Sequence, residues 1–122
     1  MSRDERIAAR LIAALDPWLP TSCTTSIDAG WLEIAIDGTA EVSVALAVDA
    51  RLSDREAVLA FNVLSTIQDV IVRDSTRPWP PASDPTYLPY PAAAIRQGLL
   101  VAWFGSEAHP IVVIPPIDLA TA

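Results

Sequence analysis

The chain is predicted to fold as one α+β domain, residues 1–122, with two helices packed on one face of an antiparallel sheet of four to five strands. Two stretches carry apolar residues at the spacing of an amphipathic helix, and the remaining apolar stretches alternate with the period of two that is typical of strands. The expected order is helix, two or three strands, helix, proline-rich loop and two strands, or α-β-β-(β)-α-loop-β-β. For that order, an antiparallel sheet with both helices on one side is the simplest packing.

The longer helix is expected from Arg55 to Asp74, where neither glycine nor proline interrupts the sequence. Ser53 and Glu56 have the spacing of a capping box that would begin it. Its apolar side chains cover more than half of the helix circumference, although a helix resting on one sheet needs a stripe only about 100° wide. The N-terminal helix or a second subunit must therefore cover the rest. The apolar residues are Ala57, Leu59, Ala60, Phe61, Val63, Leu64, Ile67, Val70, Ile71 and Val72.

The shorter helix is expected near the N-terminus, where Ser2 and Glu5 form a second capping box. Pro17 should end this helix, because proline lacks the backbone N–H that a helix interior needs. Its apolar side, formed by Ile7, Leu11, Ile12 and Leu15, indicates that it packs on the core.

Two half-buried strands are expected at residues 31–36 and 41–48, with a turn at Asp37-Gly38. A two-residue turn would place Glu33 opposite Val42 and so mix the polar and apolar faces. We therefore predict a three-residue loop with Gly38 at positive φ, which keeps the apolar residues of both strands together.

Three further strands and a long loop complete the prediction. Residues 22–27 form a short, polar edge strand with Cys23, Thr25 and Ile27 toward the core, turning at Ala29-Gly30. Residues 99–104 and 111–114 are almost wholly apolar and form a pair of covered strands that Pro115-Pro116 ends. Between the long helix and this pair, residues 77–91 contain six prolines, which excludes regular structure there. Residues 92–97 fit either a helical turn or a strand.

The composition argues against several classes of partner. Fifteen acidic residues against eight basic ones give a net charge of −7, whereas nucleic acids and anionic membranes need a basic surface. No apolar run approaches the roughly 18–20 residues of a membrane span. A single cysteine forms no internal disulfide, and the first ten residues are too charged for a signal peptide. We therefore expect a soluble cytoplasmic protein that binds neither nucleic acid nor membrane.

The sequence contains no catalytic signature. His109 is the only histidine and lies in the predicted turn, and Cys23 has no neighbouring cation to activate its thiol. The acidic residues are not clustered at metal-ligand spacing, and the four glycines are isolated, so no phosphate-binding loop is present. Asp69 and Arg73, four residues apart, are best explained as a surface ion pair. No catalytic residue, cofactor or metal ion is therefore expected.

The candidate binding residues are Arg77, Trp79, Tyr87 and Tyr90 in the proline-rich loop. Rigid prolines could present these aromatic rings to a partner as anchors, because aromatic and arginine side chains dominate many binding interfaces. Alternatively, the rings fold back over the sheet, and the loop is a static cover. The orientation of Trp79 distinguishes the two interpretations.

The favoured function is a non-catalytic protein-binding or chaperone-like module that is homodimeric, so its partner is another protein or a second copy. The same order of elements occurs in small dimeric secretion-chaperone-like domains, which is an analogy of topology that no motif carries. One alternative is a small-molecule-binding protein or enzyme with a pocket under the 77–91 loop. Another is a subunit of a larger assembly or an acidic immunity-type protein, which the net charge also suits.

Overall fold

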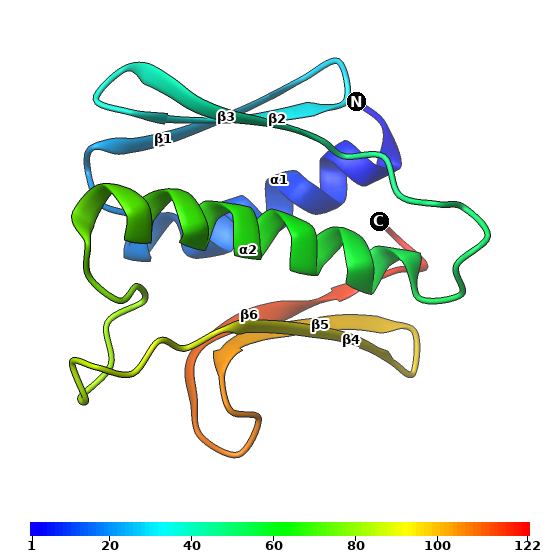
Figure 1. The fold of residues 1–122 in the computed structure, drawn as a ribbon. Coiled ribbons are helices and arrows are strands. Elements are labelled where there is room, and N and C mark those ends of the chain that lie inside the picture. Colours follow the sequence, from blue (N-terminus) through cyan, green and yellow to red (C-terminus); the bar gives the residue numbers. More distant parts are fainter.

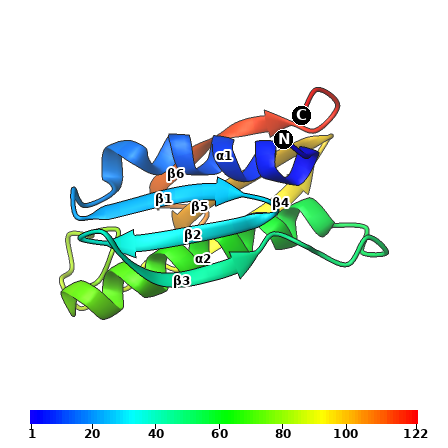
Figure 2. The ribbon, with the colours of Figure 1, turned by 90° about the horizontal axis from the view of Figure 1, so that it is seen from above.

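Two three-stranded antiparallel sheets enclose a layer of two helices in the computed structural model of the protein, which describes residues 1–122 (Figure 1). The first sheet has the order β1-β2-β3 and the second the order β4-β5-β6. Figure 2 shows that α1 lies on the side of β1 and α2 on the side of β3. The elements are α1 (Arg3–Leu15), a 3-10 turn (Asp16–Trp18), β1 (Cys23–Asp28), β2 (Trp31–Ile36), β3 (Thr39–Ala45), α2 (Arg55–Ser75), β4 (Pro91–Arg96), β5 (Leu99–Gly105) and β6 (Pro110–Asp118).

The α+β class is confirmed, but the single sheet of four to five strands with both helices on one face is wrong. Residues 91–96 form a sixth strand, which pairs with β5 and completes a second sheet on the other side of the helices. The wide apolar surface of α2 is the physical reason, because α2 packs on β4 and β5 on one side and on β2 and β3 on the other. The second sheet thus covers most of the apolar surface that one sheet leaves open.

The core is one continuous cluster of apolar side chains between the two sheets. Leu32 and Ile34 of β2 enter it from the first sheet, and Leu100 and Phe104 of β5 enter it from the second. All four side chains are fully or almost fully buried, as the alternation along each strand predicts. Nearly the whole predicted apolar side of α2 is buried as well; Val72 is half-buried, and Phe61 is exposed over 46% of its surface.

The capping box of α1 is confirmed. The backbone N–H of Glu5 donates to Ser2 Oγ at 3.1 Å, and the backbone N–H of Ser2 donates to Glu5 Oε1 at 2.9 Å. These hydrogen bonds also hold the pKa of the Glu5 carboxyl below its usual value. The helix ends before Pro17, in the 3-10 turn.

The capping box of α2 is wrong. Asp54 is the N-cap and makes no side-chain cap bond, while Glu56 accepts a hydrogen bond from Arg3 Nη1 at 2.8 Å. A guanidinium is a stronger donor to a carboxylate than a backbone amide, so this long-range pair takes the carboxylate. Arg55 of the same turn donates two hydrogen bonds to Asp4, at 2.7 and 3.1 Å. The ion pairs thus join the first turns of the two helices.

The β2–β3 hairpin has the predicted register, but a β-bulge produces it and not a three-residue loop. Asp37 and Gly38 form a two-residue turn with φ of 51° and 82°, so the positive φ of Gly38 is confirmed and the three-residue loop is wrong. Ile34 nevertheless lies opposite Val42, because a β-bulge adds Glu41 to β3. The bulge supplies the odd residue that was expected in the loop.

Strands β1 and β6 lie at edges of their sheets. The polar edge strand at residues 22–27 is confirmed, with Cys23, Thr25 and Ile27 on the inner side. The predicted stop at Pro115-Pro116 is wrong, since β6 continues to Asp118. An edge strand tolerates proline, and the register of β6 shifts at these two residues, so the missing N–H groups interrupt no regular ladder.

Replacing Arg3 by Met should reduce the stability of the protein in a pH-dependent way. The hydrogen bond from Arg3 is the main cause of the lowered pKa of Glu56, so the stabilisation is present above the usual carboxyl pKa and lost as the pH falls through the folded-state value. The difference in unfolding free energy between wild type and variant should thus be largest near neutral pH and shrink between roughly pH 5 and pH 3. Denaturant titrations across this range would measure it. Arg10→Met, on the same helix but without an ion pair, is the control; a difference that does not change with pH would contradict the prediction.

Candidate binding surface

Trp79 lies inside the protein. Its indole ring meets Phe104 edge to face, with the ring centroids 5.5 Å apart, and its Nε1–H donates to the backbone oxygen of Trp18 at 3.0 Å. Only 6% of the residue is exposed. The ring thus connects the end of α1 with β5, as in the static-cover interpretation, and is not displayed on the surface.

Gln68 holds both ends of the proline-rich loop on α2, a role that is not among the predictions from the sequence. The side chain is buried, and Nε2 donates to the backbone oxygens of Trp79 at 2.9 Å and of Pro89 at 2.7 Å. Its position in the sequence could have indicated this role. Gln68 lies between Leu64 and Ile71 on the apolar side of the helix, and a buried amide needs hydrogen-bond partners.

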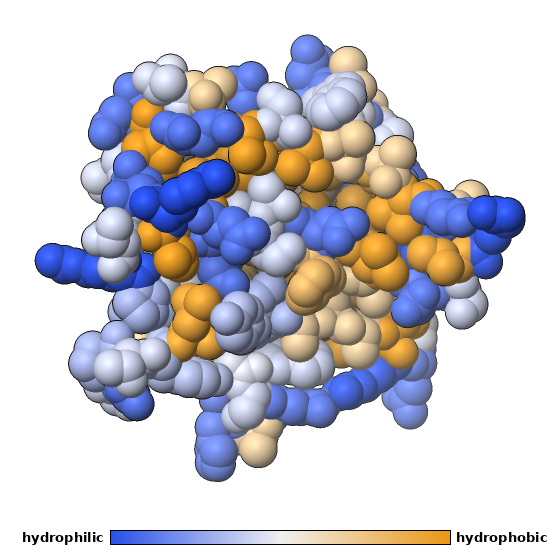
Figure 3. All heavy atoms as spheres, viewed as in Figure 1, coloured by the Kyte–Doolittle hydropathy of each residue, from blue (hydrophilic) through white to orange (hydrophobic).

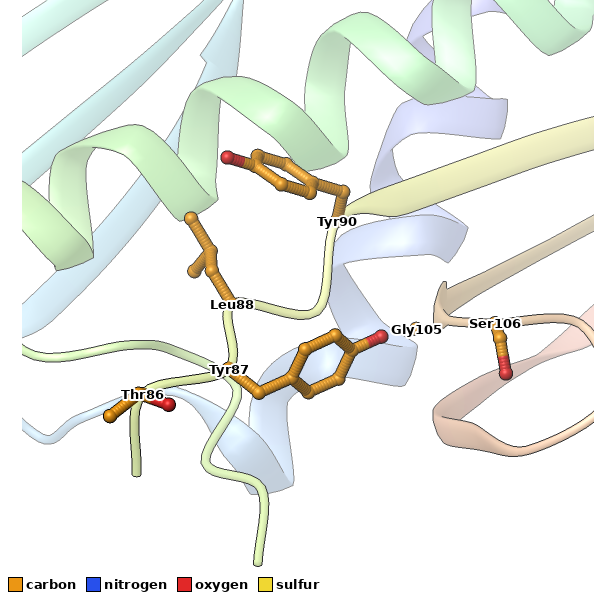
Figure 4. Close-up of a pocket in the computed structure, with 6 residues that line it drawn as sticks. All are labelled: Thr86, Tyr87, Leu88, Tyr90, Gly105 and Ser106. Carbon is orange, nitrogen blue, oxygen red and sulfur yellow. The ribbon is translucent and has the colours of Figure 1, made fainter. Parts of the chain in front are cut away.

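The other three candidate residues are exposed, and the structure brings two of them together. Tyr87 and Tyr90 line an open hollow of about 510 Å³, shown in Figure 4, in which the ring of Tyr87 points toward Gly105 and that of Tyr90 points toward α2. Thr86, Leu88, Gly105 and Ser106 complete its lining. Arg77 lies at a separate hollow formed by the prolines of the loop. The binding role of these residues stays a prediction.

The groups considered for catalysis lie apart. Cys23 is on β1 of the first sheet, and His109 is in the exposed turn before β6 of the second sheet. Burial raises the pKa of the Cys23 thiol, and the negative charge of Asp74 raises it further. No group of three or more His, Cys, Asp and Glu side chains has an arrangement that could hold a metal ion.

Two further expectations concern the helices. The ion pair between Asp69 and Arg73 is not formed, and both residues are exposed, where such a pair contributes little. None of the helices has the combination of length and apolarity that crossing a membrane requires.

The outward side of the second sheet is apolar. Residues that point away from the helices alternate with the buried ones, and no other element of the chain covers them. Leu99 is 37% exposed and Val113 is 62% exposed. We call this surface the apolar face; it consists of Ala92, Ala94, Leu99, Val101, Trp103 and Val113.

Two of the charges at the margin of the apolar face, those of Arg96 and Glu107, neutralise each other. The guanidinium of Arg96 lies over the ring of Trp103, 5.6 Å from its centroid, and forms an ion pair with Glu107. The Nε1 atom of Trp103 is buried and has no hydrogen-bond acceptor. Asp118, opposite Leu99 on β6, is exposed and has no ion pair, so the margin carries one uncompensated negative charge.

The outward side of the first sheet is polar by contrast. Its exposed residues are mostly hydroxyl and acidic ones, with Trp31 as the large apolar exception; they include Thr24, Ser26, Asp28, Glu33, Glu41 and Ser43. Both sheets face the helices with their other sides, so the difference does not arise from core packing. Leu99 and Val113 are exposed and the other four residues of the apolar face are half-buried; exposed apolar surface is a common feature of interaction sites.

The chain matches no family model, no curated protein and no solved structure.

Replacing Gln68 by Leu should destabilise the protein by about 2–4 kcal/mol, because the change keeps the volume but leaves two buried carbonyl groups without their donor. Urea unfolding would measure the loss. Asn62→Ala, at an exposed position of the same helix, should change the free energy of unfolding by no more than about 0.5 kcal/mol. Equal stabilities of the two variants would show that Gln68 does not anchor the loop.

Cys23 should react slowly with a thiol reagent in the folded protein. Burial both blocks access and disfavours the reactive thiolate. The labelling rate at mildly alkaline pH should rise steeply through the denaturant transition, where the thiol becomes exposed. Rapid labelling in native buffer would mean that β1 opens freely or that the thiol is activated.

Proposed function

We propose that the protein is a non-catalytic, chaperone-like protein-binding module that is homodimeric and contacts its partner protein through the apolar face. The observation that carries this proposal is the difference between the two outward sheet surfaces, of which one is polar and the other apolar. Exposed apolar side chains gain free energy when a partner removes them from water, roughly 25 cal/mol for each Å² buried.

The composition of the apolar face supports contact with a protein. Trp103 belongs to the face, and the guanidinium of Arg96 at its margin lies over the Trp103 ring. Tryptophan, tyrosine and arginine are the residues most enriched at binding hot spots. The hollow lined by Tyr87 and Tyr90 reaches Gly105, the last residue of β5, so it adjoins the same sheet. These two tyrosines would thus contribute to the rim of the interface.

The small-molecule alternative has less support. It requires a cavity beneath Trp79, whereas the ring of Trp79 packs on Phe104 in the core. The hollows beside the loop are open to solvent, whereas pockets for small ligands usually enclose most of the ligand surface.

An acidic immunity-type protein is the second candidate function. The observation in its favour is the outward side of the first sheet, where Asp28, Glu33 and Glu41 are exposed and unpaired in a chain of net charge −7. A basic partner bound there would associate more slowly as salt is raised, because exposed charges are screened. Binding through the apolar face would depend little on salt.

Replacing Val113 by Glu should weaken partner capture from the native host about tenfold or more, because a carboxylate would be buried without a counter-ion. The measurement is affinity capture with tagged wild-type and variant proteins, quantified by mass spectrometry. Ser43→Glu places the same charge on the outward side of the first sheet and should capture like wild type. Equal capture by all three proteins, or loss with Ser43→Glu alone, would sink the proposal. Thermal unfolding of each variant would verify that it is folded.

A further inference from the structure

The edges of the two sheets differ in how well they are protected against pairing with another chain. Edge strands are usually blunted by bulges, prolines or charges. β3 carries a bulge at Glu41, β6 contains three prolines and two register shifts, and β1 is polar and ends in Asp28. β4 has regular register over its whole length and, after Pro91, no proline or charge before Arg96. β1 also has regular register, but its side chains are mostly polar, so β4 is the regular edge that carries apolar side chains.

One hydrogen bond shows which backbone groups of β4 point toward β5 and which point toward the open edge. The N–H of Gly105 donates to the backbone oxygen of Tyr90 at 3.0 Å, and bonded pairs alternate along an antiparallel ladder. The backbone groups of Ala92 and Ala94 thus point toward β5, and those of Ala93 and Ile95 point toward the open edge. The backbone bonds outside the sheet ladders include none from β4. Together with the carbonyl of Pro91, which has the same phase, two N–H and three C=O groups are left for another strand.

We infer that a second copy of this chain pairs with β4 in antiparallel orientation and joins the two second sheets into one sheet of six strands. This inference rests on the homodimer proposed above and assigns its interface. With the two-fold axis at Ala94, Ala93 of each copy lies opposite Ile95 of the other, and four N–H···O=C bonds form. An axis at Ala93 would instead place the Ile95 carbonyl opposite Pro91, which has no N–H to donate.

The side chains around β4 suit this arrangement. Ala94 would meet its own copy at a non-hydrogen-bonded pair, where the Cα atoms approach to about 4.5 Å and small side chains fit best. Above β4 a mainly apolar groove of about 360 Å³ is lined by Ala57, Val58 and Phe61 of α2 together with residues 91–93, and the N-cap residue Asp54 is the one charged residue in its lining. Figure 3 shows apolar residues gathered on this side, over the N-terminal half of α2 and along β4. The α2 helix of a second copy would cover the exposed ring of Phe61.

The charge distribution favours a second copy at this edge over one elsewhere. The two Arg96 residues would each lie two positions from the axis, roughly 14 Å apart along the strands, which exceeds the screening length of about 8 Å at physiological salt. Each Arg96 is also neutralised by its own Glu107. Contact through the first sheet would instead bring together two copies of Asp28, Glu33 and Glu41.

The size of the contact sets the expected affinity. One six-residue strand and the side chains beside it bury less than the roughly 800 Å² per partner of a standard interface. The dimer should therefore be concentration-dependent, with a dissociation constant in the micromolar range. It would also place the apolar faces of the two copies side by side, because Ala92 and Ala94 belong both to that face and to the interface.

Charge substitutions at the axis test the register directly. Ala94→Lys and Ala94→Glu each place like charges opposite one another in the dimer, and each should raise the dissociation constant about fivefold. An equimolar mixture of the two variants should dimerise again, because the introduced ammonium meets the introduced carboxylate only if position 94 pairs with itself. Sedimentation velocity over the micromolar range would measure all three samples and wild type. Ser43→Lys, on the outward side of the first sheet, should dimerise like wild type.

Several results would overturn the inference. A wild-type protein that stays monomeric at all concentrations excludes it, and so do Ala94 variants that dimerise like wild type. A dimer that only Val113→Glu disrupts would show that the copies meet through the apolar face instead. The proposed function is tested separately by partner capture. A protein that dimerises through Ala94 but captures no partner would support the interface and contradict the protein-binding role.

Discussion

The apolar circumference of α2 is the constraint on which the rest of the structure depends. Its buried side chains extend over too wide an arc for one sheet, and burying them is the main favourable term in folding. The chain meets this demand by dividing its six strands into two sheets, one on each side of the helix layer. That solution has a consequence for function, since two small open sheets expose two outward faces and four strand edges to solvent.

The proline-rich loop closes the end of this sandwich. Trp79 fills the space between the end of α1 and β5, and Gln68 binds the backbone on either side of the loop. A loop that supplies a core side chain and buried hydrogen-bond acceptors is part of the fold. Its surface chemistry is therefore restricted to the residues that remain outside, notably Tyr87 and Tyr90.

The apolar face and the open edge of β4 are parts of one region. Ala92 and Ala94 point outward on the apolar face, while the backbone between them faces the free edge. Phe61, on the other side of β4, extends the apolar surface onto α2. The first sheet offers no such combination, because its outward residues are polar and its β3 edge is bulged. Charge and polarity thus divide the molecule into a polar side and an apolar side.

The sequence by itself determined the features that depend on neighbours along the chain. Both helices, the capping box of Ser2 and Glu5, the alternation of the strands and the positive φ of Gly38 follow from local spacing and backbone sterics. Tertiary structure decided the rest, because it depends on groups distant in sequence. Glu56 accepts a hydrogen bond from Arg3 and does not cap α2. Gln68 donates to carbonyls of the loop, and the ring of Trp79 packs on Phe104 in the core. The division into two sheets belongs to the same class, since strand periodicity specifies which side chains are buried but not which strands pair.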